Sequence, residues 1–120
     1  MIFSRPRDSR ITPEQAHRMV QDRSALLVDV RESDEYRAGH APGAVHVPLS
    51  RLSAGVADVP GTDGDRRIVL VCRSGNRSRQ AARLLVGRGV PCADVRGGML
   101  AWSAAGLTVQ DAHGATGSVI

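Results

Sequence analysis

The sequence predicts an α/β protein with a mostly parallel central sheet flanked by helices, and three observations support this prediction. Short aliphatic runs that are typical of buried strands alternate with segments of helical periodicity. Glycine, proline and short polar residues separate these segments. The chain has 120 residues, the length of one domain, and contains no internal repeat. Such an alternation places helices on both faces of the sheet through right-handed crossovers.

The first helix is predicted to begin after Thr12. Thr12 is expected to be the N-cap, Pro13 occupies the first helical position, and Gln15 lies three residues after the cap, which is the pattern of a capping box. The apolar periodicity fades by Arg23, where we expect the helix to have ended. Ile11, before the cap, is assigned to a short first strand.

Three further segments follow from the same patterns. Residues 25–29 are predicted to be a buried strand because they form a nearly continuous apolar run. A short helix is expected over residues 33–38, with Ser33 as its cap and Gly39 as its stop. Residues 44–47 are predicted to form a short third strand.

The second half repeats the alternation around a central strand over residues 68–71. Before it, residues 49–59 carry a weak helical pattern and residues 60–65 have the composition of a surface loop. After it come a loop, a helix that ends near Gly87, and a strand over residues 92–95.

The chain then reaches a turn at Gly97 and Gly98, and a final short helix over residues 99–105 follows. Trp102 in this helix is expected to pack inward. The two glycines are predicted to let the backbone approach a thiol pocket closely, because they lack side chains.

That pocket is predicted around Cys72, where the central aliphatic strand ends. A loop of arginine, serine, glycine and asparagine follows the cysteine, and an amphipathic helix follows the loop. The first N–H groups of a helix lack partners within it, and the helix dipole adds about half a positive charge there. Arg73 and Arg77 add permanent positive charge. This pattern indicates a nucleophilic thiolate in an anion-binding loop.

The usual alternative for a cysteine at a strand end is a small buried apolar residue. The charged and polar residues after Cys72 favour the reactive interpretation, since a core cysteine needs no such surroundings. Cys92 lacks these surroundings and is predicted to be a core residue, with a resolving or second sulfur-accepting thiol as the alternative.

Four segments follow one another along the chain: Leu27–Glu32, Tyr36–Pro48 with its Gly-His-x-Pro-Gly-Ala pattern, the cysteine loop 72–78, and Gly97–Trp102. In sequence and in order these segments resemble the motifs of the rhodanese family of sulfurtransferases. The resemblance implies a rhodanese-like three-layer fold, which we assign to residues 10–109. By composition, residues 1–9 are a flexible lead-in and residues 110–120 a flexible tail.

The resemblance also implies a thiosulfate sulfurtransferase in which Cys72 is catalytic and carries the transferred sulfur as a persulfide. The substrate-binding residues are then the rest of the loop, namely Arg73, Ser74, Gly75, Asn76, Arg77 and Ser78. Their backbone N–H groups are expected to converge on the sulfur, and the two arginines to attract a dianionic donor. Ser78 is expected to cap the following helix or to bond Cys72.

Asp29 and Arg31 match family residues that support the cysteine loop. The alternative is a structural pair that closes the turn before the next helix, and the two roles are compatible. The expected partners are a small anionic sulfur donor and a thiol, cyanide or sulfur-carrier protein as acceptor.

Other function classes remain as alternatives or are excluded. A persulfide relay to a partner protein and a non-catalytic rhodanese-like binding module stay open. A phosphatase or arsenate reductase is disfavoured, because those loops place five residues between cysteine and arginine, whereas four separate Cys72 from Arg77. The two cysteines and four histidines lack metal-ligand spacing, so neither a metal nor a cofactor is expected.

Composition argues against two classes of partner. The net charge is +4 and all sixteen basic residues are arginine, but they are scattered and accompanied by one Phe, one Trp and one Tyr, which argues against nucleic acid. No apolar run approaches the ~20 residues of a membrane span.

The first ten residues lack the apolar core of a secretory signal, so we expect a cytoplasmic protein.

Overall fold

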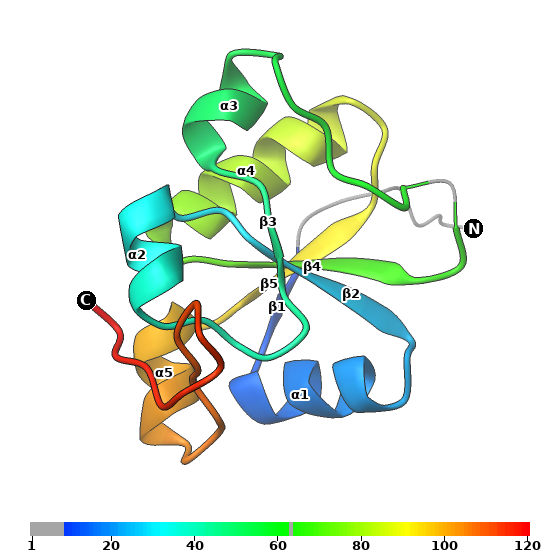
Figure 1. The fold of residues 1–120 in the computed structure, drawn as a ribbon. Helices are drawn as coiled ribbons and strands as arrows, with labels where there is room; N and C mark the ends of the chain where they lie inside the picture. Colours follow the sequence, from blue (N-terminus) through cyan, green and yellow to red (C-terminus); the bar gives the residue numbers. More distant parts are fainter. Residues whose placement is uncertain (1–8, 63) are drawn as a thin grey trace.

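A five-stranded parallel sheet forms the centre of the computed structural model, which describes residues 9–62 and 64–120 (Figure 1). Every pair of neighbouring strands is parallel, as the sequence predicts. In spatial order the strands are β1 (Arg10–Ile11), β5 (Cys92–Val95), β4 (Arg67–Val71), β2 (Ala25–Asp29) and β3 (Val45–His46).

Helices cover both faces of this sheet, which completes the predicted three-layer α/β architecture. One face carries α1 (Pro13–Gln21) and α5 (Gly98–Ala104), and the other carries α3 (Leu49–Ser53) and α4 (Asn76–Gly87) (Figure 1). The short helix α2 (Ser33–Ala38) lies at one end of the sheet, close to the chain's C-terminal segment (Figure 1). Within the described residues, no helix is both long enough and apolar enough to span a bilayer.

The central strand β4 divides its side chains between the two layers of core. Ile68 and Leu70 point to the layer under α4, and Val69 and Val71 point to the layer under α1 and α5. All four are at most 2% exposed, as expected for a strand buried on both faces. The same alternation puts Cys72, the residue after the strand, in the α4 layer.

Local sequence signals place several element boundaries correctly. At α1 the predicted capping box is present, with the Gln15 amide donating to the Thr12 side chain and the Gln15 side chain accepting from the Thr12 amide. The predicted strands over residues 25–29 and 92–95 are confirmed to the residue, and Trp102 is buried as expected.

Several boundaries differ from the prediction. The strand expected over residues 44–47 is shorter, at Val45–His46, and the helix expected over residues 99–105 begins and ends one residue earlier. Glu32, not Ser33, caps α2, because the Glu35 side chain reaches back 3.1 Å to the Glu32 amide and Ser33 is already helical. The weak pattern over residues 49–59 yields a helix that ends at Ser53. Two residues later Gly55 has a φ of 76°, a left-handed conformation that ends a helix.

Residues 110–120 follow a defined path, whereas their composition predicts a flexible tail. Gln110 exchanges backbone hydrogen bonds of 2.8 and 2.9 Å with His40, and the Ser118 amide donates to the Ala38 carbonyl. A side chain at Gly117 would lie 2.7 Å from that carbonyl, so the glycine permits the close approach. Of the predicted lead-in, residues 1–8 lie outside the described residues, and the Ser9 carbonyl accepts from the Asp94 amide.

Candidate active site

The loop after β4 turns sharply between Cys72 and the start of α4. Gly75 is the N-cap of α4 with a φ of 107°, a conformation that side chains disfavour. A Cβ atom at this position would also lie 2.6 Å from Nη2 of Arg10. Gly75 therefore fixes the curl that brings the loop back over the cysteine, as the sequence predicts.

The sulfur of Cys72 is held by two contacts. The Gly75 N–H donates to Sγ at 3.1 Å, and Sγ lies 3.5 Å from Oγ of Ser78 in the first turn of α4. The Cys72 residue is 1% exposed. Of the loop amides expected to converge on the sulfur, the amide of Gly75 makes a hydrogen bond to it in this structure.

Helix α5 orients the peptide units on either side of Arg73. Its first amides bond the loop carbonyls, from Met99 N–H to Cys72 at 2.7 Å and from Leu100 N–H to Arg73 at 3.0 Å. A peptide unit is planar and trans, so its N–H points opposite to its carbonyl. The N–H groups of Arg73 and Ser74 therefore point away from α5.

This contact between α5 and the loop requires a glycine. A Cβ atom on Gly98 would lie 2.3 Å from the Cys72 carbonyl oxygen and 2.5 Å from that of Arg73, and the φ of Gly98 is 60°. The prediction that the glycine pair allows a close backbone approach to the thiol loop is confirmed at this position.

Arg77 is bound to an acidic residue that sequence analysis did not identify. Its two Nη atoms donate to the two carboxylate oxygens of Glu35 in α2, at 2.6 and 2.8 Å. The ion pair lowers the pKa of the Glu35 carboxyl and raises the pKa of Arg77. The negative form of Cys72 also acts to raise the pKa of Arg77, which places the guanidinium within electrostatic reach of the sulfur.

The remaining polar residues of the loop face solvent. Ser74, Asn76 and Arg73 are exposed. Arg73 donates from Nε to the Ile120 carbonyl at 3.1 Å. Its two Nη atoms have no hydrogen-bond partner among the residues that the structure describes. Both positive charges expected at the loop are therefore present. Arg73 has free Nη donors, whereas the Nη donors of Arg77 are bound to Glu35.

Asp29 and Arg31 form a buried ion pair at the end of β2. Both are fully buried, with Arg31 Nε 2.9 Å from Oδ1 of Asp29 and Nη2 2.7 Å from Oδ2. Nη2 also donates to the Gly39 carbonyl, the residue that follows α2. The pair closes the turn around α2 and so positions the helix that carries Glu35. This geometry corresponds to the structural role considered for the pair, with an indirect link to the cysteine loop.

Two further residues near the sulfur were missed by sequence analysis. Asp94 in β5 is fully buried, and its Oδ2 lies 3.0 Å from Ser78 Oγ and 3.1 Å from Arg10 Nη2. The same Arg10 nitrogen donates to the Gly75 carbonyl. The available signal was an aspartate inside an apolar strand, since a buried charge requires a partner.

Cys92 lies in the core, as predicted. It is 1% exposed, and its Sγ contacts the Ala82 carbonyl at 3.6 Å. Cys92 is in register with Ile68, four residues before Cys72 along β4. Four strand residues span roughly 13 Å, whereas a disulfide needs Cα atoms within about 7 Å. The two thiols therefore cannot pair in this conformation.

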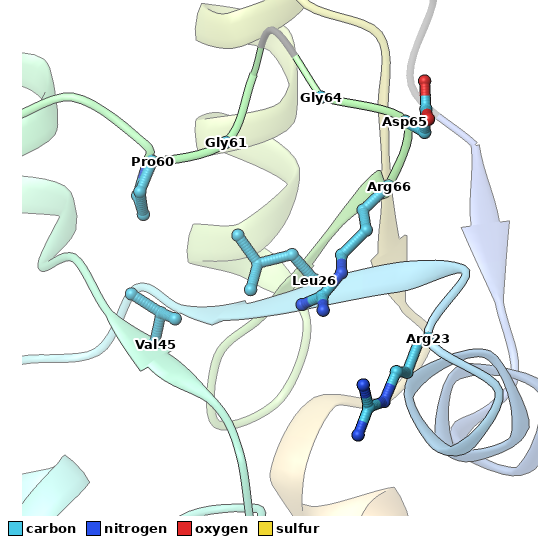
Figure 2. A pocket seen from close by; sticks show the side chains of 8 residues that line it. All are labelled: Arg23, Leu26, Val45, Pro60, Gly61, Gly64, Asp65 and Arg66. Atoms are coloured by element: carbon cyan, nitrogen blue, oxygen red, sulfur yellow. The ribbon is translucent and has the colours of Figure 1, made fainter.

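A cleft of about 580 Å³ lies at the opposite edge of the sheet, near the N-terminal ends of β2 and β4. Leu26, Val45 and Pro60 form its apolar part, and Arg23 and Arg66 carry its positive charge (Figure 2). None of its lining residues belongs to the Cys72 loop, so the cleft is separate from the thiol site.

Comparison with known proteins identifies related sequences. A family model described as rhodanese-like domain matches residues 12–105. The thiosulfate sulfurtransferase GlpE of Pseudomonas savastanoi is 38% identical, over 79% of this chain and 87% of that protein. The HTH-type transcriptional regulator Rv0324 of Mycobacterium tuberculosis is 35% identical over 92% of this chain, which spans about half (48%) of the regulator.

Solved structures give the same fold. A Rhodopseudomonas palustris protein of unknown function, described as a possible tyrosine phosphatase, superimposes with a TM-score of 0.75 and 27% identity. The match covers 85% of this chain and 84% of that protein.

Proposed function

Because this chain belongs to the rhodanese-like family, we propose that it is a sulfurtransferase that moves the outer sulfur of thiosulfate, or of a similar donor, through a persulfide on Cys72. The observation that carries the proposal is the Gly75 N–H, which donates to the Cys72 sulfur at 3.1 Å at the start of a helix. A hydrogen-bond donor at this position stabilises negative charge on a thiolate and then on a persulfide.

The reaction takes place in two steps. In the first, the Cys72 thiolate attacks the outer sulfur of thiosulfate, a new S–S bond forms on Cys72, and the S–S bond of the donor breaks with its electron pair leaving on sulfite. In the second, a thiolate or cyanide acceptor attacks the outer sulfur of the persulfide and the Cys72 thiolate leaves. Covalent catalysis of this kind divides one transfer into two easier ones.

Positive charge on the cysteine loop favours a dianionic donor. Arg73 presents two Nη groups with no partner among the described residues, and guanidinium donors suit the oxygens of a sulfonate. Arg77 adds a second guanidinium whose charge Glu35 balances. Since Cys72 is 1% exposed, the groups around it must move before a donor reaches Sγ.

Loop length favours sulfur chemistry over phosphate chemistry. Four residues separate Cys72 from Arg77, and a phosphatase loop has five, which makes a ring wide enough for a tetrahedral oxyanion. The residue after Arg77 is Ser78, so the longer spacing has no arginine.

The test is the sulfur adduct itself. The purified protein is incubated with thiosulfate, and intact mass and released sulfite are measured for the wild type, Cys72→Ser and Cys92→Ser, the last as a matched buried-cysteine control. We expect one added sulfur atom and one equivalent of sulfite for the wild type and Cys92→Ser, and neither for Cys72→Ser. Cyanide should then remove the sulfur as thiocyanate.

Three results would contradict the proposal. An adduct that persists in Cys72→Ser would place the chemistry elsewhere. Hydrolysis of an aryl phosphate without any sulfur adduct would support a phosphatase. A wild-type protein that forms no adduct and binds one protein partner tightly would support a binding module. An adduct that cyanide cannot remove but a partner thiol can would instead identify a relay to a protein acceptor.

A further inference from the structure

A chain of buried polar atoms runs from the Cys72 sulfur to the carboxylate of Asp94. Sγ lies 3.5 Å from Ser78 Oγ, and Ser78 Oγ lies 3.0 Å from Asp94 Oδ2. Ser78 and Asp94 are both fully buried. Burial makes the direction of each hydrogen bond matter, because no solvent competes for the protons.

Strand register explains why the carboxylate reaches this place. Cys92 and Asp94 alternate with Ala93 and Val95 along β5, so Asp94 points to the α4 layer. Asp94 is in register with Leu70, two residues before Cys72. The acidic side chain therefore lies under the cysteine loop and next to the first turn of α4.

Asp94 forms an ion pair with Arg10. Nη2 of Arg10 lies 3.1 Å from Oδ2 of Asp94 and donates to the Gly75 carbonyl at 3.0 Å. One guanidinium thus joins the acid to the loop. The other carboxylate oxygen, Oδ1, is buried and has no hydrogen-bond partner among the described residues.

The hydrogens available to Cys72, Ser78 and Asp94 determine which group donates in each of these hydrogen bonds. A carboxylate only accepts hydrogen bonds, and a serine hydroxyl has one hydrogen to donate. Ser78 gives that hydrogen to Asp94, so towards Cys72 it can only accept. The contact between Sγ and Ser78 therefore needs the proton on sulfur and stabilises the neutral thiol. The Gly75 N–H, in contrast, stabilises the thiolate.

We propose that Asp94 is a positioning residue that acts through Ser78 to hold Cys72 as a thiol in the resting protein and so sets the pH at which the sulfur becomes reactive. This proposal rests on the proposed function because that function gives the reactive sulfur its use. Its test is independent, since thiol reactivity can be measured without a sulfur donor. A site that keeps its nucleophile protonated protects it from oxidation, because the thiolate is the reactive form.

Charged groups on the neighbouring elements contribute to the balance between the thiol and thiolate forms of Cys72. Asp94 from β5 opposes the thiolate, and Arg10 from β1 partly offsets Asp94. Arg77 from α4 favours the thiolate, and Glu35 from α2 offsets Arg77. Asp29, the last residue of β2, and Arg31 neutralise each other. Arg73, in the loop itself, is exposed. Asp94 is the charge that reaches the sulfur through a hydroxyl.

The test measures alkylation of Cys72 by iodoacetamide against pH, by mass spectrometry, in a Cys92→Ser background. Asp94→Asn keeps the shape of the side chain but removes its negative charge. The amide oxygen takes the place of Oδ2 beside Arg10 and Ser78 and accepts from the hydroxyl more weakly, which leaves the hydroxyl freer to donate to the thiolate. We expect the midpoint of the pH profile to fall by about one unit, so that alkylation below the midpoint becomes about tenfold faster. The exposed Asp58→Asn is the matched control and should leave the midpoint unchanged.

Ser78→Ala tests the route and remains informative where Asp94→Asn does not fold. It removes the acceptor, so we expect its midpoint to fall as well. In the Ser78→Ala background, adding Asp94→Asn should shift the midpoint less than it does alone, because the hydroxyl that links the two groups is gone. An unchanged or higher midpoint in Asp94→Asn or Ser78→Ala would overturn the proposal. If the midpoints shift as expected but the wild type forms no sulfur adduct with thiosulfate, the proposed function fails and this proposal stands.

Discussion

Arg77 and Glu35 form a bidentate ion pair that links the start of α4 to α2. The Nη atoms of Arg77 lie 2.6 and 2.8 Å from the carboxylate oxygens of Glu35. The pair lies beside a cysteine that is 1% exposed. Its geometry is the same fork-to-fork arrangement with which a guanidinium binds an oxyanion. Glu35 therefore occupies, in the resting protein, the donors that Arg77 would offer to an incoming sulfonate.

Replacing Glu35 by Gln should strengthen the binding of an anionic donor. The change removes a negative charge beside the site and releases two guanidinium donors. A partly exposed pair is worth about 1 kcal/mol, which corresponds to about a fivefold decrease in KM for thiosulfate. Steady-state kinetics at low and high salt checks this, with Glu14→Gln on α1 as the control. A higher KM would mean that Glu35 holds Arg77 in the orientation the donor needs.

The same ion pair gives the protein a predictable dependence of stability on pH. Arg77 holds the pKa of Glu35 below its usual value, so the folded state binds the proton less readily than the unfolded chain. The stabilisation is therefore complete above the unfolded pKa of about 4.3 and is lost as pH falls through the lower folded pKa.

Urea denaturation of the wild type and Glu35→Gln measures this contribution directly. We expect the wild type to have the higher free energy of unfolding at pH 7, by about 1 kcal/mol, and the difference to shrink at about pH 3, below the unfolded pKa. A difference that stays constant between the two pH values would show that the carboxylate charge is not what stabilises the fold.

Gly98→Ala should damage both stability and activity. The new Cβ would lie 2.3 Å from a loop carbonyl, and a φ of 60° is unfavourable for alanine. We expect a loss of about 2–3 kcal/mol or a shifted cysteine loop. Gly87→Ala is the matched control, because nothing lies within 4 Å of its Cβ position at the end of α4. That control should be neutral or stabilising by up to ~1 kcal/mol. Thermal unfolding and sulfite release distinguish the two variants.

Sequence patterns predict the elements whose signals are local. The strand over residues 92–95 and the capping box at Thr12 follow from periodicity and side-chain type, and both are present. The loop around Cys72 is also a contiguous segment, so the contact of Gly75 with the sulfur follows from the chain's own curl. These features need no information about which elements are neighbours.

Contacts between distant elements were not predictable in this way. Glu35 and Arg77 are 42 residues apart and Ser78 and Asp94 are 16 apart, and nothing in either local pattern specifies the partner. The tail shows the same limit, because its polar, glycine-rich composition is typical of disorder while its backbone bonds His40. Such pairings depend on the packing of whole elements.

The buried pair of Asp29 and Arg31 permits a sharp test of what supports the site. Arg31→Lys keeps the charge but cannot reproduce two parallel bonds to Asp29 together with the bond to the Gly39 carbonyl. Because both side chains are fully buried, we expect a loss of about 3 kcal/mol in the free energy of unfolding. The exposed Arg37 in the last turn of α2 gives the control variant, Arg37→Lys. If Arg31→Lys unfolds at the wild-type urea concentration, then the pair does not hold the turn around α2, and the position of Glu35 must depend on other contacts.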